Sequence, residues 1–337
     1  MVLKRFVTIL TIAAICLTGC VESRNVGTGH GPGDAGLTGT DSNLQSIEVW
    51  TNQYGPGLKL TTQHYEVYTT LLNSRLLERI GRFMESAYQN YNGQLPGPIE
   101  TVTRFRIYLF AGRSQWEDFT RAFTGEQAQT YCAIKAGAYC HNGTCVAYDI
   151  GERRTFEALG HEGWHQFNSR HFKFRLPSWL DEGVAMLFEK YGDNGQGFYF
   201  NPGGNEYRLR ALSKTLTKDK MIPLKELVVM NPGDVLATDE TEAVMAFYSQ
   251  SYALVRFLME SSQGQRLGVY RRLLADGLKG DWPLDEVSGK IASDRNYPRT
   301  ILWNHIVGLV LFEEYVGYDF EQIEKEYLAF CRQITNN

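Results

Sequence analysis

The sequence predicts an α+β fold, with a small twisted mixed sheet in the N-terminal half and a mostly helical C-terminal part. Strand patterns come early in the chain and helical patterns come late, which favours separate strand and helix regions over a repeating β-α unit. The chain has 337 residues, of which 43% are hydrophobic, and this is too apolar for a disordered protein. Its one long apolar run lies at the N-terminus, which excludes a polytopic membrane protein.

The individual elements follow from hydrophobic periodicity. Residues 59–70 alternate as a strand does, residues 103–109 are rich in aromatic and β-branched side chains, and residues 136–150 predict a hairpin. Apolar residues at helical spacing predict helices over residues 71–91, 114–123, 155–167, 176–191, 242–261, 265–277, 299–315 and 320–334.

Residues 1–19 have the pattern of an export signal. Two basic residues precede a short apolar run, and small residues precede Cys20. This end resembles a bacterial lipobox, whose cysteine becomes the lipidated first residue after cleavage; the alternative is an ordinary secretory signal with a chance cysteine. Acylation at Cys20 would anchor the chain to a membrane through its N-terminal lipid. Val21 follows, which by resemblance to sorting in bacteria with two membranes favours the outer membrane of the cell envelope.

The rest of the chain divides into a tether and one domain. Residues 20–45 are rich in glycine and small polar residues that cannot fill a core, so we expect a flexible tether. Residues 46–337 would form the domain, with the sheet over about residues 46–167 and the helices over 168–337. The net charge of −4 comes without a basic block, so nucleic acid is not an expected partner, and we expect a monomer.

Four cysteines remain after export, in an oxidising compartment where up to two disulfides can form: Cys132, Cys140, Cys145 and Cys331. Asn142-Gly143 predicts a type I′ turn, which places Cys140 opposite Cys145 as a non-hydrogen-bonded pair. A disulfide between these two is therefore the first candidate, and the other two cysteines are the leftover pair. Alternatively, three cysteines and His141 could bind zinc, although no C-x-x-C pair is present.

One motif carries chemistry. His161-Glu162-Gly163-Trp164-His165 is H-E-x-x-H, and two histidines four residues apart on a helix face the same way and can hold one metal ion. Two neutral imidazoles and a carboxylate suit Zn²⁺. Glu162 can take a proton from a metal-activated water and pass it to a leaving amine. The alternative is an amphipathic helix with a chance pair of surface histidines.

A third ligand is present downstream. Trp179-Leu180-Asp181-Glu182-Gly183-Val184-Ala185 lies in the next predicted helix. A glutamate from that helix can reach across to complete a His-His-Glu set, which leaves the fourth position for water.

H-E-x-x-H followed by W-L-x-E-G-x-A resembles the gluzincin zinc metallopeptidases of the peptidase MA-like clan, and most of all its uncharacterised bacterial lipoprotein members. The resemblance is sharp over residues 155–190. It implies that His161, His165 and Glu182 hold Zn²⁺ and that Glu162 is the general base. It also implies a twisted sheet above a cleft and helices below, with an edge strand that binds extended peptide; the 136–150 hairpin is our candidate for that edge.

The sequence departs from two branches of this clan. The G-x-M-E-N segment that holds the substrate amine in aminopeptidases is absent, so we do not expect aminopeptidase activity. The thermolysin-like branch has an aspartate four residues after its ligand glutamate, and this chain has Met186 there. A carboxylate behind the ligand histidines must therefore come from elsewhere. Glu157 is a candidate, although a solvated helix residue is the more expected role.

The resemblance also implies a tyrosine or histidine that stabilises the oxyanion of the reaction. Tyr248 is our candidate, and Tyr252, one helical turn later, is the alternative; otherwise both are core or rim aromatics. We expect His171 and His305 to be structural or exposed.

The sequence thus predicts zinc-dependent hydrolysis of a peptide or protein substrate in the cell envelope. Two other functions stay open. One is a catalytically inactive peptidase-fold lipoprotein that acts as a binding or structural module. The other is a zinc amidase acting on cell-wall peptides, which rests on the expected location alone.

Overall fold

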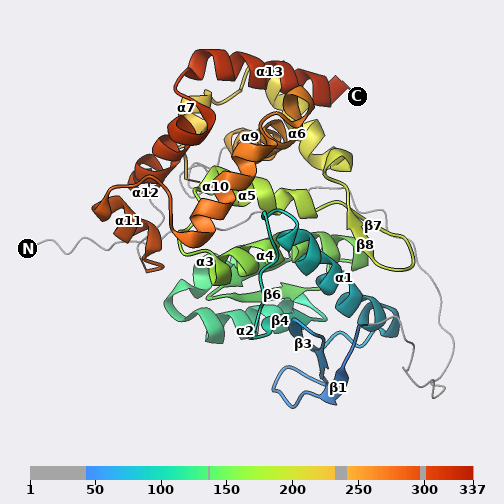
Figure 1. The fold of residues 1–337 in the computed structure, drawn as a ribbon. Helices are drawn as coiled ribbons and strands as arrows, with labels where there is room; N and C mark the ends of the chain where they lie inside the picture. Colours follow the sequence, from blue (N-terminus) through green and yellow to red (C-terminus); the bar gives the residue numbers. More distant parts are fainter. Residues whose placement is uncertain (1–42, 136, 232–240, 297–300, 337) are drawn as a thin grey trace, which may run out of the picture.

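A computed structural model describes residues 43–135, 137–231, 241–296 and 301–336 (Figure 1). The expected export signal, the lipidation site at Cys20 and almost all of the expected tether lie outside these ranges. Among the described helices, none is long and apolar enough to cross a membrane.

One mixed sheet of six strands forms the lower part of the molecule in Figure 1. Its strands are β1 (Ser46–Val49), β2 (Leu58–Thr61), β3 (Tyr65–Thr69), β4 (Phe105–Phe110), β5 (Ala138–His141) and β6 (Thr144–Tyr148). The spatial order is β1-β2-β3-β4-β6-β5. The β3–β4 and β4–β6 pairs are parallel and the other three pairs are antiparallel. The predicted mixed sheet is confirmed, and β5 from the predicted hairpin is an edge strand.

The hairpin has the predicted turn and register. Asn142 and Gly143 both have positive φ, 48° and 69°, as a type I′ turn requires. Cys140 lies opposite Cys145, and His141 lies opposite Thr144. A short turn with this chemistry fixes the register, which is why the sequence predicted it correctly.

The single strand predicted over residues 59–70 is wrong, because the chain turns back at residues 62–64 to make β2 and β3. The backbone N–H of Thr62 donates to the carbonyl of Tyr65 at 2.9 Å, and the N–H of Tyr65 donates to Oγ1 of Thr62 at 3.0 Å. Glu85, from a helix 23 residues away, accepts from the Thr62 hydroxyl and stabilises this turn. Alternation of side chains does not reveal such a long-range contact.

Helices cover both faces of the sheet. On one face lie α1 (Ser74–Asn92) and α4 (Glu152–His171), which bury Phe105, Ile107 and Leu109 of β4. On the other face lie α2 (Arg113–Thr124) and the short α3 (Ala128–Cys132), in a second cluster that includes Phe110. Alternate residues of the same strand therefore supply two separate cores.

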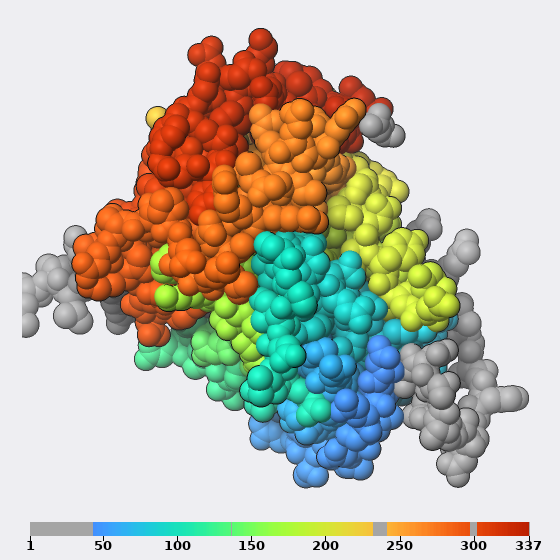
Figure 2. All heavy atoms as spheres, in the orientation of Figure 1, coloured from blue at the N-terminus to red at the C-terminus, as the bar shows by residue number. Residues whose placement is uncertain are grey.

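The C-terminal part is mostly helical and forms the upper part of the molecule in Figure 2. Its helices are α5 (Ser178–Ala185), α6 (Glu206–Thr217), α7 (Leu224–Leu227), α9 (Thr241–Glu260), α10 (Leu267–Lys279), α11 (Glu286–Ser293), α12 (Ile301–Asn304) and α13 (Phe320–Asn336). A small hairpin of β7 (Tyr191–Asp193) and β8 (Phe198–Phe200) interrupts them. The predicted order of strands first and helices later is confirmed.

Two of the predicted helices differ from the structure. The helix predicted over residues 176–191 ends at Ala185, where a 3₁₀ turn, η2 (Met186–Phe188), leads into β7. The helix predicted over residues 299–315 begins outside the described residues and continues as α12 and two π-helical turns, His305–Leu309 and Phe312–Val316. Apolar residues continue past both points, as in Met186–Phe188 and Val307–Phe312, so the periodicity did not reveal these irregularities.

The pairing of Cys132 with Cys331 is also wrong. Cys132 is the last residue of α3, and its thiol faces the carbonyl of Glu117. Cys331 is buried in α13 beside Tyr327. Figure 1 shows α3 and α13 far apart. All four described cysteines are free thiols, so the Cys140–Cys145 disulfide stays a prediction. The sequence predicts this pair only because the two cysteines are left over, and it contains no information about where their helices lie.

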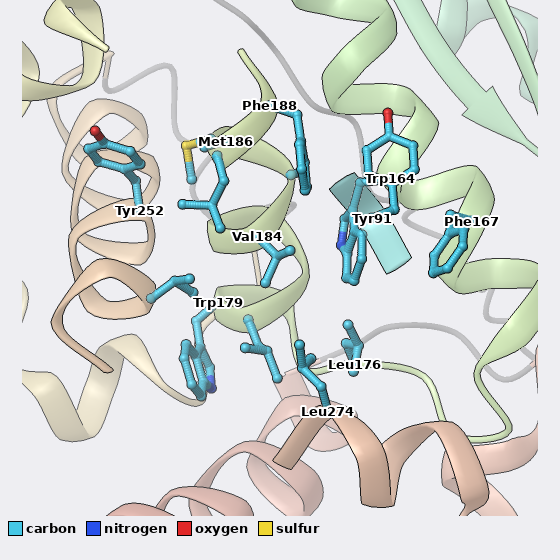
Figure 3. Close-up of a cluster of buried hydrophobic side chains, with 14 of the residues drawn as sticks. Tyr91, Trp164, Phe167, Leu176, Trp179, Val184, Met186, Phe188, Tyr252 and Leu274 are labelled. Atoms are coloured by element: carbon cyan, nitrogen blue, oxygen red, sulfur yellow. The ribbon is translucent and has the colours of Figure 1, made fainter. Parts of the chain in front are cut away.

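Helix α5 lies between α4 and α9, packed on both sides. Figure 3 shows Val184 and Met186 between Tyr252 of α9 and Trp164 of α4. A Cβ at Gly183 would overlap the carbonyl oxygen of Ser251, so glycine lets α5 and α9 approach closely. Because α4 and α5 are held in a dense core, the polar side chains between them have fixed positions.

Candidate metal centre

Helix α4 supplies the H-E-x-x-H motif and is longer than predicted. It begins after Gly151, whose positive φ of 91° starts the helix, and Glu152 in the first turn complements its dipole. Phe156, Leu159 and Trp164 are fully buried and pack the helix into the core. His161 and Glu162 are also buried, in a place where polar groups need partners.

The structure brings together the three residues predicted to hold a metal. Nε2 of His161 lies 3.2 Å from Nε2 of His165. Oε2 of Glu182, on α5, lies 3.4 Å from the first of these nitrogens and 3.8 Å from the second. Among the described residues, this is the one group of three or more histidine, cysteine or acidic side chains close enough to share an ion. The cysteine–His141 alternative therefore gains no support.

These separations fit a tetrahedral zinc site. Zinc binds imidazole nitrogen and carboxylate oxygen at about 2.0–2.2 Å, which at tetrahedral angles places neighbouring donor atoms about 3.3–3.6 Å apart. The three donor–donor distances given above bracket this range. The donor set, two imidazoles and one carboxylate, is also one that zinc uses in catalytic sites.

The burial of Glu182 points to a cation independently. Its side chain is fully buried, and neither carboxylate oxygen accepts a hydrogen bond from the described residues. A buried carboxylate without hydrogen bonds costs several kcal/mol unless a positive charge compensates it. A metal ion between this oxygen and the two imidazoles supplies that charge.

Carboxylates hold the far side of both imidazoles. Nδ1 of His161 lies 3.0 Å from Oε1 of Glu189, and Nδ1 of His165 lies 3.0 Å from Oδ1 of Asp181. A carboxylate accepts a hydrogen bond from an imidazole N–H. It therefore fixes Nδ1 as the protonated nitrogen and leaves the Nε2 lone pair for a metal. The Glu189 carboxylate is held in turn by Arg208, at 2.6 and 2.8 Å, and by Asn205 at 2.8 Å.

These two carboxylates were missed at the sequence level. Asp181 immediately precedes Glu182, and its adjacency in the motif was an available signal. Glu189 follows η2. It reaches α4 because Gly160 has no Cβ, which lets the backbone at Phe188 approach closely; a Cβ there would overlap the backbone oxygen of Phe188. Glu157 contacts neither ligand histidine among the described interactions; it is partly exposed and pairs with Arg153 at 3.2 Å, as expected of a helix-surface residue.

The carboxylates make the site a strong attractor of positive charge. Burial alone lowers the pKa of His161, but the nearby carboxylates of Glu182 and Glu189 outweigh it and raise that pKa to about 9. Burial likewise lowers the pKa of His165, and Asp181 and Glu182 raise it to about 10. Without a metal, protons take the place of the cation that the acidic groups require.

Glu162 lies near the three donor residues but forms no hydrogen bond with them among the described interactions. It is 2% exposed, and its Oε1 has no hydrogen-bond partner among the described residues. Burial raises its pKa above the ordinary value, and the two histidines partly offset this effect. A carboxylate that is buried, unpaired and next to the donor set is suited to accept a proton from water.

The two candidate tyrosines differ. The Tyr252 hydroxyl donates to the carbonyl of Pro202 and accepts from Arg256 at 3.0 Å, so it is engaged away from the donor set. Tyr248 is buried on α9, and the Arg208 guanidinium lies 5.5 Å from its ring centroid. Tyr248 therefore lies next to the arginine that holds Glu189, and its role as oxyanion donor stays a prediction.

His171 and His305 have the expected structural or exposed roles. Nε2 of His171 bonds to Oγ1 of Thr101 at 2.8 Å, and its ring centroid lies 4.7 Å from that of Phe167. His305 is exposed.

No protein-family model matches the chain, and no curated protein matches it either.

Proposed function

We propose that this chain is a zinc metallopeptidase of the gluzincin type, anchored by an N-terminal lipid at Cys20 in the bacterial cell envelope, with the outer membrane as its expected location. The observation that carries the proposal is the convergence of His161, His165 and an otherwise unpaired Glu182 at donor distances suited to one zinc ion. The lipid anchor rests on the sequence alone.

The roles of the residues follow from their positions. A bound zinc ion would act as a Lewis acid, lowering the pKa of water and polarising the scissile carbonyl. Glu162 takes a proton from the attacking water and returns it to the leaving amine. Asp181 and Glu189 keep the two imidazoles oriented. Tyr248 remains our candidate for stabilising the oxyanion.

The edge strand β5 supports an extended peptide as the substrate. Tyr139–Val146 and His141–Thr144 are the hydrogen-bonded pairs, so the backbone groups of Ala138 and Cys140 point away from β6. Within the described part of the chain, these groups have no other backbone partner. Such a free edge can accept a peptide as an added strand, and β5 packs on α4, which carries the donor set.

The test is Glu162→Gln. We expect hydrolysis of a broad peptide library to fall at least about a hundredfold, because the proton acceptor is lost while the zinc ligands remain. Zinc content, measured by mass spectrometry, should equal that of the wild type. Glu78→Gln, the same change at an exposed position of α1, is the matched control and should keep full activity.

Chelation of the wild-type protein should abolish cleavage, and added zinc should restore it. If the Glu162→Gln protein hydrolyses peptides at the wild-type rate, the mechanism is wrong. If the wild type binds zinc but cleaves no peptide in the library, the inactive binding module is the better interpretation.

A further inference from the structure

A small cavity adjoins the metal centre on the side of Glu189. Its volume is about 120 Å³, and its lining includes Arg153, Arg154, Glu157, Lys190, Glu206 and Tyr207. A water molecule takes up roughly 30 Å³ in the liquid, so the cavity suits a short side chain or a terminal group rather than a large ring.

The cavity lies about one helical turn from the reacting groups. Glu157 and Ala158 line it, and they precede His161 and Glu162 by four residues on the same helix. Four residues of α-helix span about 6 Å. An extended peptide advances about 3.3 Å per residue, so a group one or two residues from the cleaved bond can reach the cavity.

Among the described cations that line the cavity, Lys190 lies near Glu157 but forms no ion pair. Each carboxylate of the lining has a cationic neighbour, in the pairs Glu157–Arg153 at 3.2 Å, Glu189–Arg208 at 2.6 Å and Glu206–Arg210 at 2.5 Å. The Lys190 ammonium has no carboxylate within ion-pair distance in the described ranges. It is partly exposed, so its charge is available to a ligand.

Backbone dipoles add to this charge. The cavity lies at the first turns of both α4 and α6, since Arg153 and Glu206 line it. The N-terminal end of a helix carries partial positive charge, which Glu152 in α4 and Glu206 in α6 offset in part and which favours an anion beside the ammonium.

We infer that this cavity is a specificity pocket for a carboxylate of the peptide substrate, with Lys190 as the residue that recognises it. The inference rests on the proposed peptidase function and names the substrate class that this site prefers. The carboxylate comes either from an acidic side chain near the cleaved bond or from the C-terminus of the peptide; the chemistry is the same.

The experiment compares peptides that differ in one group. One series carries Glu, Asp, Gln or Lys at each position flanking the cleaved bond, and every peptide is made with a free and with an amidated C-terminus. We expect the wild type to prefer the peptides with a carboxylate about twofold to fivefold in kcat/KM, the scale of one partly exposed ion pair. Loss of the preference on amidation identifies the C-terminus as the source, and its retention identifies the side chain.

Charge reversal makes the test specific. Lys190→Glu should reverse the preference, so that a peptide with Lys at the selected position becomes better than one with Glu. Lys279→Glu, the same change at an exposed position of α10, is the matched control and should leave the preference unchanged. Cleavage without charge preference, or a preference that Lys190→Glu does not alter, overturns this inference alone. Failure to cleave any peptide overturns the proposed function and the inference with it.

Discussion

Two histidine–carboxylate arrangements lie in the described part of the chain, and they differ in what surrounds the carboxylate. At the turn between β2 and β3, Nδ1 of His64 lies 2.6 Å from Oε2 of Glu85. This imidazole stacks on Tyr88 with ring centroids 3.8 Å apart. Oε1 of Glu85 accepts from the Thr62 hydroxyl at 2.5 Å and from the backbone N–H of His64 at 2.8 Å. The carboxylate is fully satisfied, and the pair holds α1 against the β2–β3 turn.

At the metal centre, Asp181 and Glu189 hold the imidazoles in the same manner, yet a third carboxylate, Glu182, has no hydrogen bond. A histidine–carboxylate pair is therefore not by itself a sign of a metal. The signs are convergence of two Nε2 atoms and a buried carboxylate that no protein group satisfies.

The largest effect that separates the two arrangements is on metal content. Glu182→Ala should reduce bound zinc from about one ion per chain to almost none, because two imidazoles alone do not make a stable site. Glu85→Ala should retain zinc. Mass spectrometry after dialysis measures both, with circular dichroism to confirm folding. Full zinc content in the Glu182→Ala protein would remove this residue from the ligand set.

A smaller effect is expected behind the ligands. Asp181→Asn keeps the size of the side chain but removes the charge that orients His165, and we expect zinc affinity to fall about 10–100-fold. Competition with a fluorescent chelator measures this affinity. An unchanged affinity would show that Asp181 is dispensable for holding the imidazole.

At the sheet, the expected effect is on stability alone. Glu85→Gln removes an acceptor from a buried network, so the free energy of unfolding should fall by about 1–3 kcal/mol. Denaturant unfolding monitored by fluorescence measures it, while zinc affinity serves as the control and should not change. A weaker affinity would mean that this network also supports the metal centre.

The smallest effect is a pH dependence at the end of α4. Burial lowers the pKa of His171 from 6.5 to about 4, and neighbouring Arg170 adds to this shift. Because the folded state disfavours the proton, the unfolded state binds more protons between these values, and stability falls as the pH drops from about 6.5 towards 4.

His171→Gln should flatten that part of the curve of unfolding midpoint against pH. His305→Gln, at an exposed position, should leave the curve unchanged. An equally steep curve in the His171→Gln protein would assign the pH dependence to other groups.

The comparison also shows what the sequence could predict. His161 and His165 are four residues apart on one helix, so local geometry alone places them together. The prediction of Glu182 as the third ligand required only that α5, the next helix along the chain, pack against α4. Glu189 depended on a 3₁₀ turn and on the close approach at Gly160, and Arg208 on the placement of α6. Neither depends on local spacing, so neither could be predicted.

The fold follows the same rule. The 142–143 turn and the register of β5 with β6 are local, and the sequence predicted them. The split of β2 from β3 depends on Glu85, and the positions of Cys132 and Cys331 depend on the packing of distant helices. Contacts between residues far apart in the chain decided both of these points.

X-ray absorption at the zinc edge of the purified protein tests the central claim most directly. We expect one zinc ion per chain, bound by nitrogen and oxygen at about 2.0–2.2 Å. The multiple scattering in the spectrum should correspond to two imidazole ligands. Sulfur at about 2.3 Å would place the metal on the cysteines instead, and either that result or the absence of bound zinc would contradict the account.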